Sequence, residues 1–90
     1  MQSQDLPELY TLMMYAAFVL AERAISLAWV TRILQQPERT EPDRADPALV
    51  HVLGRVAECG NRVLRVIYND TTNPKRIVTV YFDRTQRDRV

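Results

Sequence analysis

Two windows near the N-terminus repeat apolar residues at the spacing of an α-helix. Residues 12–23 are apolar on nearly every side, and such a helix has to be covered on more than one side. Residues 27–35 instead carry a single apolar face. This face consists of Trp29, Val30, Ile33 and Leu34. The pattern therefore predicts two helices, with Thr11 and Ser26 as their N-caps.

The second half of the chain alternates β-rich runs with turn residues. Val, Ile and Tyr fit a half-buried pleated surface, and they are concentrated in residues 49–56, 62–68 and 76–82. Gly60 and residues 69–74 supply the turns between these runs. Short connections favour antiparallel pairing. We therefore expect an α+β fold, in which two N-terminal helices pack on one face of an antiparallel sheet of three or more strands.

The pattern between and beyond these elements indicates one domain over residues 1–90. Residues 37–47 hold three prolines and six charged residues without an apolar period, which predicts a surface loop and not a domain linker. Residues 1–10 are predicted to form a loose N-terminal arm or a short edge element. Residues 85–90 are predicted to form a basic tail.

Composition narrows the class of protein. The 47% hydrophobic and 26% charged residues are typical of a globular domain. The longest apolar run, residues 12–21, is half the roughly 20 residues that a membrane-spanning helix needs. The single cysteine, Cys59, and the absence of a signal-peptide pattern predict a cytoplasmic protein. One histidine and one cysteine do not make a zinc site, so we expect neither a metal nor a cofactor.

The net charge of +1 hides an asymmetry between the two halves of the chain. Residues 1–48 carry four basic and seven acidic residues, whereas residues 49–90 carry eight basic and four acidic residues. A basic half can mark a surface that faces an anion such as RNA. A solvated sheet edge explains the asymmetry about equally well.

Alternation along the predicted strands places polar residues on one face of the sheet. His51 and Arg55 share a face of the first strand, Arg65 lies on the second, and Tyr81 and Asp83 lie on the third. If these faces meet, the arginines would hold phosphate, and His51 or Tyr81 would transfer protons in metal-independent RNA cleavage. A solvent-facing antiparallel sheet typically carries the same residue types, which is the structural alternative.

The first predicted helix offers a second candidate surface. Its Met and aromatic residues are typical of a core or an oligomer contact, and they predict a homodimer or a partner-bound protein. The alternative is an apolar ligand pocket. The candidate pocket residues are Met14, Tyr15, Phe18 and Trp29.

The order of several segments resembles that of a known family. The segments are LAERAIS, ILQQPERTEPD, GRV, RVLRVIYN and RIVTVYFDR. They resemble the bacterial family called domain of unknown function 4258, which is similar to the BrnT and RelE ribonuclease toxins of toxin–antitoxin pairs. The resemblance implies a RelE/BrnT-like fold and suggests RNA cleavage, or binding to RNA or to an antitoxin-like partner. The alternative function is a non-enzymatic dimeric scaffold or an apolar-ligand-binding protein.

Two positions depart from the residues common in that family. Tyr15 stands where a histidine is common, and an unperturbed phenol, with a pKa of about 10, does not act as a base near neutral pH. Ala24 stands where a glycine is common. An alanine with left-handed backbone at this helix end would be about 1 kcal/mol less stable than a glycine.

Overall fold

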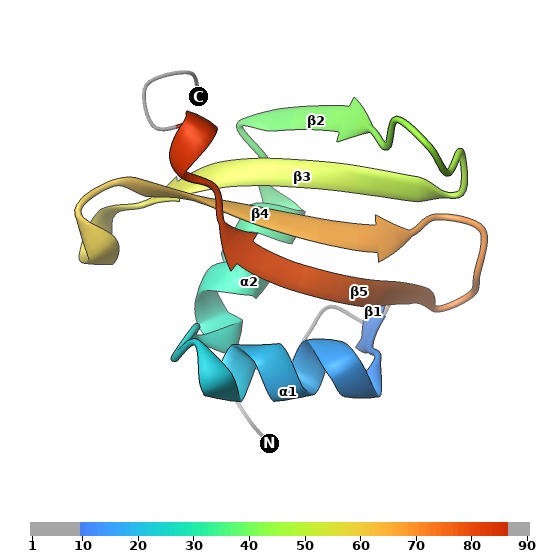
Figure 1. The fold of residues 1–90 in the computed structure, drawn as a ribbon, viewed down its shortest axis with the longest axis horizontal. Helices are drawn as coiled ribbons and strands as arrows, with labels where there is room; N and C mark the ends of the chain where they lie inside the picture. Colours follow the sequence, from blue (N-terminus) through green and yellow to red (C-terminus); the bar gives the residue numbers. More distant parts are fainter. Residues whose placement is uncertain (1–9, 87–90) are drawn as a thin grey trace.

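The computed structural model describes residues 10–86, which form two helices and a five-stranded sheet (Figure 1). In chain order the elements are β1 (Tyr10–Leu12), α1 (Met14–Glu22), α2 (Leu27–Gln35), β2 (Arg39–Pro42), β3 (Leu49–Val56), the 3-10 helix η1 (Ala57–Cys59), β4 (Arg62–Asn69), β5 (Lys75–Phe82) and the 3-10 helix η2 (Arg84–Gln86). The predicted α+β fold is confirmed. Most of the predicted N-terminal arm and the end of the predicted basic tail lie outside the described residues.

The strand order of the sheet is β1-β5-β4-β3-β2. Its centre is the predicted antiparallel meander, in which β4 pairs with both β3 and β5. β2 extends the sheet antiparallel to β3, whereas β1 pairs with β5 in parallel. The sheet is therefore mixed and larger than the three strands predicted from the sequence. A register shift after Ile67 in β4 skips Val78, so that Tyr68 lies opposite Ile77.

The predicted surface loop at residues 37–47 is wrong in part, because Arg39–Pro42 form strand β2. This strand contains no aliphatic residue, so hydrophobic alternation does not reveal it. Pro42 is compatible with the assignment because β2 is an edge strand, where proline is tolerated.

The predicted N-cap at Thr11 is also wrong. Thr11 lies in β1 opposite Arg76 of β5, and the Met13 N–H donates to the carbonyl of Ile77 (3.0 Å). α1 therefore begins later, at Met14, and its N-cap residue Met13 makes no side-chain capping hydrogen bond. Parallel pairing with β5 competes successfully with the helix for these residues.

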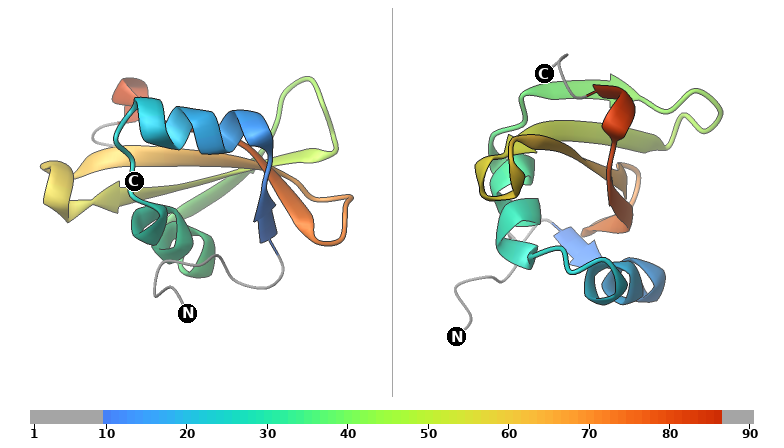
Figure 2. Two further views of the ribbon diagram at one scale, coloured as in Figure 1. Left: turned by 90° about the horizontal axis from the view of Figure 1, so that it is seen from below. Right: turned by 60° about the vertical axis from the view of Figure 1, so that its left-hand side comes forward.

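Both helices pack on one face of the twisted sheet, α1 against β5 and β1, and α2 against β3 and β4 (Figure 2). The core lies between the two layers. Its buried members are Ala16, Leu20, Ile25, Val30, Ile33, Leu34, Val52, Val56, Leu64, Val66, Tyr68, Ile77 and Val80. Because side chains alternate along a strand, the intervening residues of β3, β4 and β5 lie on the face away from the helices.

The end of α1 is a Schellman motif. Arg23 is the C-cap, and Ala24 follows with a φ of 53°, in the left-handed region. The Ile25 N–H donates to the Leu20 carbonyl (2.9 Å), and the Ala24 N–H donates to the Ala21 carbonyl (3.3 Å), which are the two hydrogen bonds of this motif. The turn fixes where Arg23 leaves the helix.

Two further local predictions are confirmed. The Ser26 hydroxyl caps α2 by accepting from the Ala28 N–H (3.1 Å), and Gly60 turns the chain between β3 and β4 with a φ of 68°. Within residues 10–86, no helix has the length and apolar character needed to cross a bilayer.

Candidate functional site

A buried arginine lies at the centre of the sheet face away from the helices. Arg65 of β4 is only 6% exposed, and its strand neighbours are Leu53 of β3 and Tyr81 of β5. Its Nε and Nη2 each lie 2.8 Å from Asp83 Oδ2, and its Nη1 lies 2.9 Å from Glu41 Oε1. The buried charge is therefore compensated by two carboxylates.

These contacts shift the pKa of all three groups. Burial alone would lower the pKa of Arg65, but the hydrogen bonds to Glu41 and Asp83 outweigh it and raise the pKa. The hydrogen bond from Arg65 lowers the pKa of Glu41. For Asp83, burial acts to raise the pKa, but hydrogen bonds from Thr85 and Arg65 together lower it. The cluster therefore keeps its ionised form at neutral pH.

The ring of His51 has protein partners on both nitrogens. Its Nδ1 lies 2.7 Å from Arg65 Nη1, and its Nε2 lies 2.7 Å from Asp43 Oδ1. Because a guanidinium only donates, Nδ1 must accept, and the proton of the neutral ring resides on Nε2 and is donated to Asp43. Backbone N–H donation from Asp46 and then the His51 contact lower the pKa of Asp43. His51 thus fastens the loop after β2 to the sheet.

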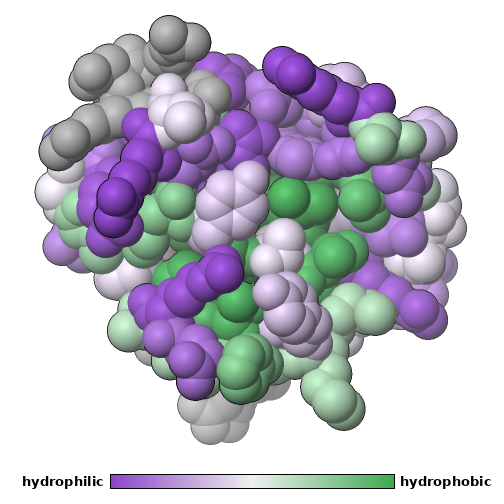
Figure 3. All heavy atoms as spheres, viewed as in Figure 1, coloured by the Kyte–Doolittle hydropathy of each residue, from purple (hydrophilic) through white to green (hydrophobic). Residues whose placement is uncertain are grey.

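The structure brings together three of the residues expected on this face, namely His51, Arg65 and Asp83, and places Tyr81 beside them. Arg55 stands apart, opposite Val63, with its Nε 3.9 Å from a carboxylate oxygen of Glu38. In Figure 3, hydrophobic residues gather at the centre of this face and hydrophilic residues surround them. The buried residues there include Leu53, Val63 and Ile67.

A second site lies at the end of the sheet where α1, β4 and β5 meet. Three arginines from different elements line it: Arg23 at the end of α1, Arg62 at the start of β4 and Arg84 in η2. Two adjoining cavities, of about 340 and 430 Å³, share Arg62, Phe82 and Arg84 as lining residues. We call this site the arginine groove and define it by the three arginines with Thr79, Tyr81 and Phe82.

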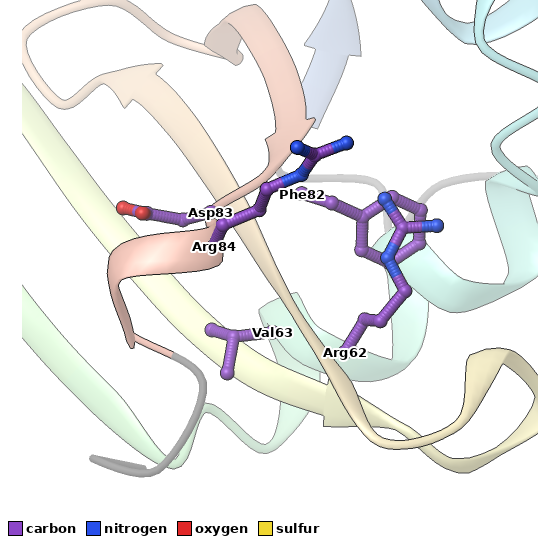
Figure 4. A pocket seen from close by; sticks show the side chains of 5 residues that line it. All are labelled: Arg62, Val63, Phe82, Asp83 and Arg84. Atoms are coloured by element: carbon purple, nitrogen blue, oxygen red, sulfur yellow. The ribbon is translucent and has the colours of Figure 1, made fainter.

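Aromatic packing positions the arginine groove. The guanidinium of Arg62 stacks over the Phe82 ring at 4.1 Å, and the other neighbour of Phe82 is Trp29 of α2, with ring centroids 6.3 Å apart. The Arg23 Nη1 donates to the Val80 carbonyl (3.0 Å). Figure 4 shows the guanidinium groups of Arg62 and Arg84 near the Phe82 ring, while Asp83 points away from them.

The arginine groove is positively charged, since three of its six defining residues are arginines. In residues 10–86, no carboxylate forms an ion pair with Arg23, Arg62 or Arg84. Asp83 lines the smaller cavity beside Arg62 and Arg84, but its carboxylate is paired with Arg65, and Figure 4 shows it pointing away from the two groove guanidinium groups. Guanidinium groups that converge in this way are suited to bind a phosphate group, because each presents a fixed fork of donors.

The candidate apolar pocket residues do not share either cavity. Met14, Tyr15 and Phe18 are 89%, 58% and 58% exposed on the outer side of α1. Trp29 lies on α2 against Phe82 and the core cluster. Tyr15, which stands where a histidine is common in the family that the sequence resembles, thus faces solvent on α1.

Sequence reasoning missed Glu41 and Asp43, because strand β2 and the loop after it were not predicted to reach the sheet face. It also missed the arginine groove as a unit. The signal for the groove was present in part, since the β-rich region from Arg62 to Arg84 begins and ends with arginine and lies in the basic half. Among the described residues, no group of three or more His, Cys, Asp or Glu side chains could hold a metal ion.

Comparison with known proteins identifies one family. The sequence model described as Domain of unknown function (DUF4258) matches residues 16–82, which is most of the chain. No curated protein and no solved structure matches the chain.

Proposed function

The chain belongs to the DUF4258 family, and we propose that it is an RNA-binding module that holds RNA phosphates in the arginine groove. The observation that carries this proposal is the convergence of Arg23, Arg62 and Arg84 on one hollow without an acidic partner among the described residues. Fixed positive charge of this kind supplies most of the affinity of proteins for nucleic acids. A cytoplasmic location, where RNA is available, is part of the proposal.

The lining of the arginine groove favours RNA over a small inorganic anion. Tyr81 and Phe82 add aromatic surface beside the guanidinium groups, and unpaired bases stack on aromatic rings and on arginine planes. The outer face of the Arg62 guanidinium, whose inner face covers Phe82, is a further stacking plane. A phosphate and its neighbouring base thus find complementary groups within the same site.

The geometry supports binding more directly than cleavage. Arg65 is neutralised by Glu41 and Asp83, and both nitrogens of His51 are engaged. A general base needs an imidazole nitrogen within reach of the substrate proton. We therefore propose binding through the arginine groove, with His51 and Arg65 stabilising the sheet face. An antitoxin-like protein partner would form ion pairs with the same arginines only if it presented acidic side chains to the groove.

Fluorescence anisotropy with a labelled single-stranded RNA of ten nucleotides tests the proposal. We expect binding that weakens when Arg62 or Arg84 is replaced by Gln. The matched control is Arg55→Gln, which removes an exposed arginine from outside the groove and should leave the affinity unchanged. Trp29 is the only tryptophan and contacts Phe82, so its fluorescence should change when the groove fills.

Two further experiments distinguish RNA binding from the binding of an acidic protein segment and from RNA cleavage. A peptide of nine glutamates with blocked ends carries the same charge as the nine internucleotide phosphates of the RNA but no bases, and it should bind more weakly than the RNA. Equal affinity for the two ligands, with the same dependence on Arg62 and Arg84, would instead identify an acidic protein segment as the ligand. Incubation of the RNA with protein and a chelator should leave the RNA intact. Cleavage would instead support the expected catalytic role of His51 and Tyr81 and contradict a binding module.

A further inference from the structure

We propose that the exposed side of α1 joins two copies of this protein in a two-fold symmetric dimer, with the two helices antiparallel. The outer side of α1 is an unbroken surface of exposed residues. Its members are Met14, Tyr15, Ala17, Phe18, Ala21 and Glu22, and we call it the α1 face. At about 100° per residue these positions cover about 160° of the helix, a contiguous strip.

The protein's own core does not use this strip. Ala16, Val19 and Leu20, on the opposite side of α1, make the contacts with the sheet. Met14 is 89% exposed, and Tyr15 and Phe18 are each 58% exposed, so large apolar side chains stand in water. Exposed apolar patches of this kind typically mark interaction sites.

Charge indicates that the occupant is a second copy of the chain. From Met14 to Ala21 the helix carries no charged residue, so it offers nothing to a partner that is selected by charge. The first turn of α1 also contains no acidic residue, and the N-cap Met13 makes no side-chain capping hydrogen bond. Within residues 10–86, neither the first turn nor the N-cap thus places a negative group at the positive end of the helix dipole.

Glu22 supplies that group in an antiparallel pair. It is exposed at the last turn of α1, where its charge is unfavourable for its own helix dipole, and it has no ion-pair partner among the described residues. Antiparallel packing brings Glu22 of each copy to the uncapped N-terminus of the other. Parallel packing would instead place the two Glu22 carboxylates side by side.

The dimensions fit a small two-fold interface. Two alanines, Ala17 and Ala21, are one turn apart on the strip and allow the helices to approach closely at their crossing. Large side chains expose on the order of 200 Å² each when free, so the strip offers about 500 Å² per copy. The pair therefore buries on the order of 1,000 Å², near the lower limit for a specific interface. An interface of this size is typical of weak or transient association.

Sedimentation equilibrium from 1 μM to 1 mM tests the proposal on the full chain. We expect a monomer–dimer equilibrium with a dissociation constant on the order of micromolar. Met14→Glu with Phe18→Glu should produce a monomer that keeps the parent's circular dichroism, because both side chains are exposed in the monomer. Glu22→Gln should raise the dissociation constant about three- to ten-fold, since two equivalent dipole contacts are lost.

Cross-linking tests whether the α1 faces of two copies meet. In a Cys59→Ser background, Phe18→Cys lies at the middle of the strip and should form a disulfide-linked dimer on mild oxidation. The matched control is Thr40→Cys, an exposed site on β2 far along the sheet, which should not cross-link. A protein that is monomeric at 1 mM, or a dimer that survives the double glutamate change, would overturn the proposal. So would a monomer whose α1 face binds only a different protein.

Discussion

Replacing Ala24 by glycine should stabilise the protein. Ala24 is the left-handed residue of the Schellman motif after α1, with a φ of 53°, a conformation that strains most residues other than Gly and Asn. Its backbone hydrogen bond to the Ala21 carbonyl and the neighbouring bond from Ile25 to Leu20 do not involve the methyl group. The substitution therefore removes strain without removing a contact of the motif.

The magnitude follows from two opposing effects. A left-handed conformation costs an alanine about 1 to 2 kcal/mol that a glycine does not incur. Glycine also makes the unfolded chain more flexible, which costs about 0.4 to 1 kcal/mol. The difference is a gain of about 1 kcal/mol in the free energy of unfolding. For a domain of this size that gain raises the melting temperature by about 4 to 8 °C.

Urea denaturation followed by circular dichroism measures the effect. The matched control is Ala17→Gly, the same chemical change at an exposed position inside α1. There the backbone is helical, so glycine should destabilise the protein by about 1 kcal/mol. Opposite signs at the two positions are expected. A glycine at Ala24 that lowers the midpoint, or that changes it as the control does, would refute the left-handed cap.

Three further changes follow from the same structure. Gly54→Val should destabilise the protein by about 1 to 3 kcal/mol, because a Cβ at this position would meet Ile33 Cγ1 at 3.0 Å. Gly54→Ala adds the Cβ without the two methyl groups of valine and should destabilise the protein less, which urea melts of the two variants measure. Ser26→Ala should cost about 1 kcal/mol in the same assay, because it removes the α2 cap. The pKa values of Glu41 and Asp83 are lower in the folded protein than in the unfolded chain, where they are about 4. The stability that these carboxylates contribute is therefore present above about pH 4 and is lost as the pH falls through their folded-state pKa values. The melting temperature should fall in that acid range, and it should fall less steeply for Asp83→Asn.

The sequence predicts an element correctly where the residues of that element alone determine whether it is a helix or a strand. The apolar period of residues 27–35 and the β-rich runs after residue 49 predict α2 and the central meander, since hydrophobic patterning and turn residues agree there. Alternation also places His51, Arg65 and Asp83 on one sheet face, and the register of β4 with its neighbours brings them together.

The missed features depend on contacts between distant segments. β2 has no hydrophobic pattern of its own and exists because it pairs with β3, and with it Glu41 reaches Arg65. The arginine groove needs Arg23 at the Schellman turn to meet Arg62 and Arg84, which lie far along the chain. No local pattern encodes either meeting, because the first depends on the pairing of β2 with β3 and the second on the packing of α1 on the sheet.

The salt dependence of RNA binding tests the central claim most directly. Each phosphate contact with a single strand contributes about −0.7 to the slope of log K against log salt concentration, so three groove arginines predict a slope of about −2. Anisotropy titrations between 50 and 300 mM salt measure it. We expect Arg62→Gln and Arg84→Gln each to make the slope shallower by about 0.7 and Arg55→Gln to leave it unchanged. A slope near zero, or one that all three substitutions reduce equally, would contradict RNA binding in the arginine groove.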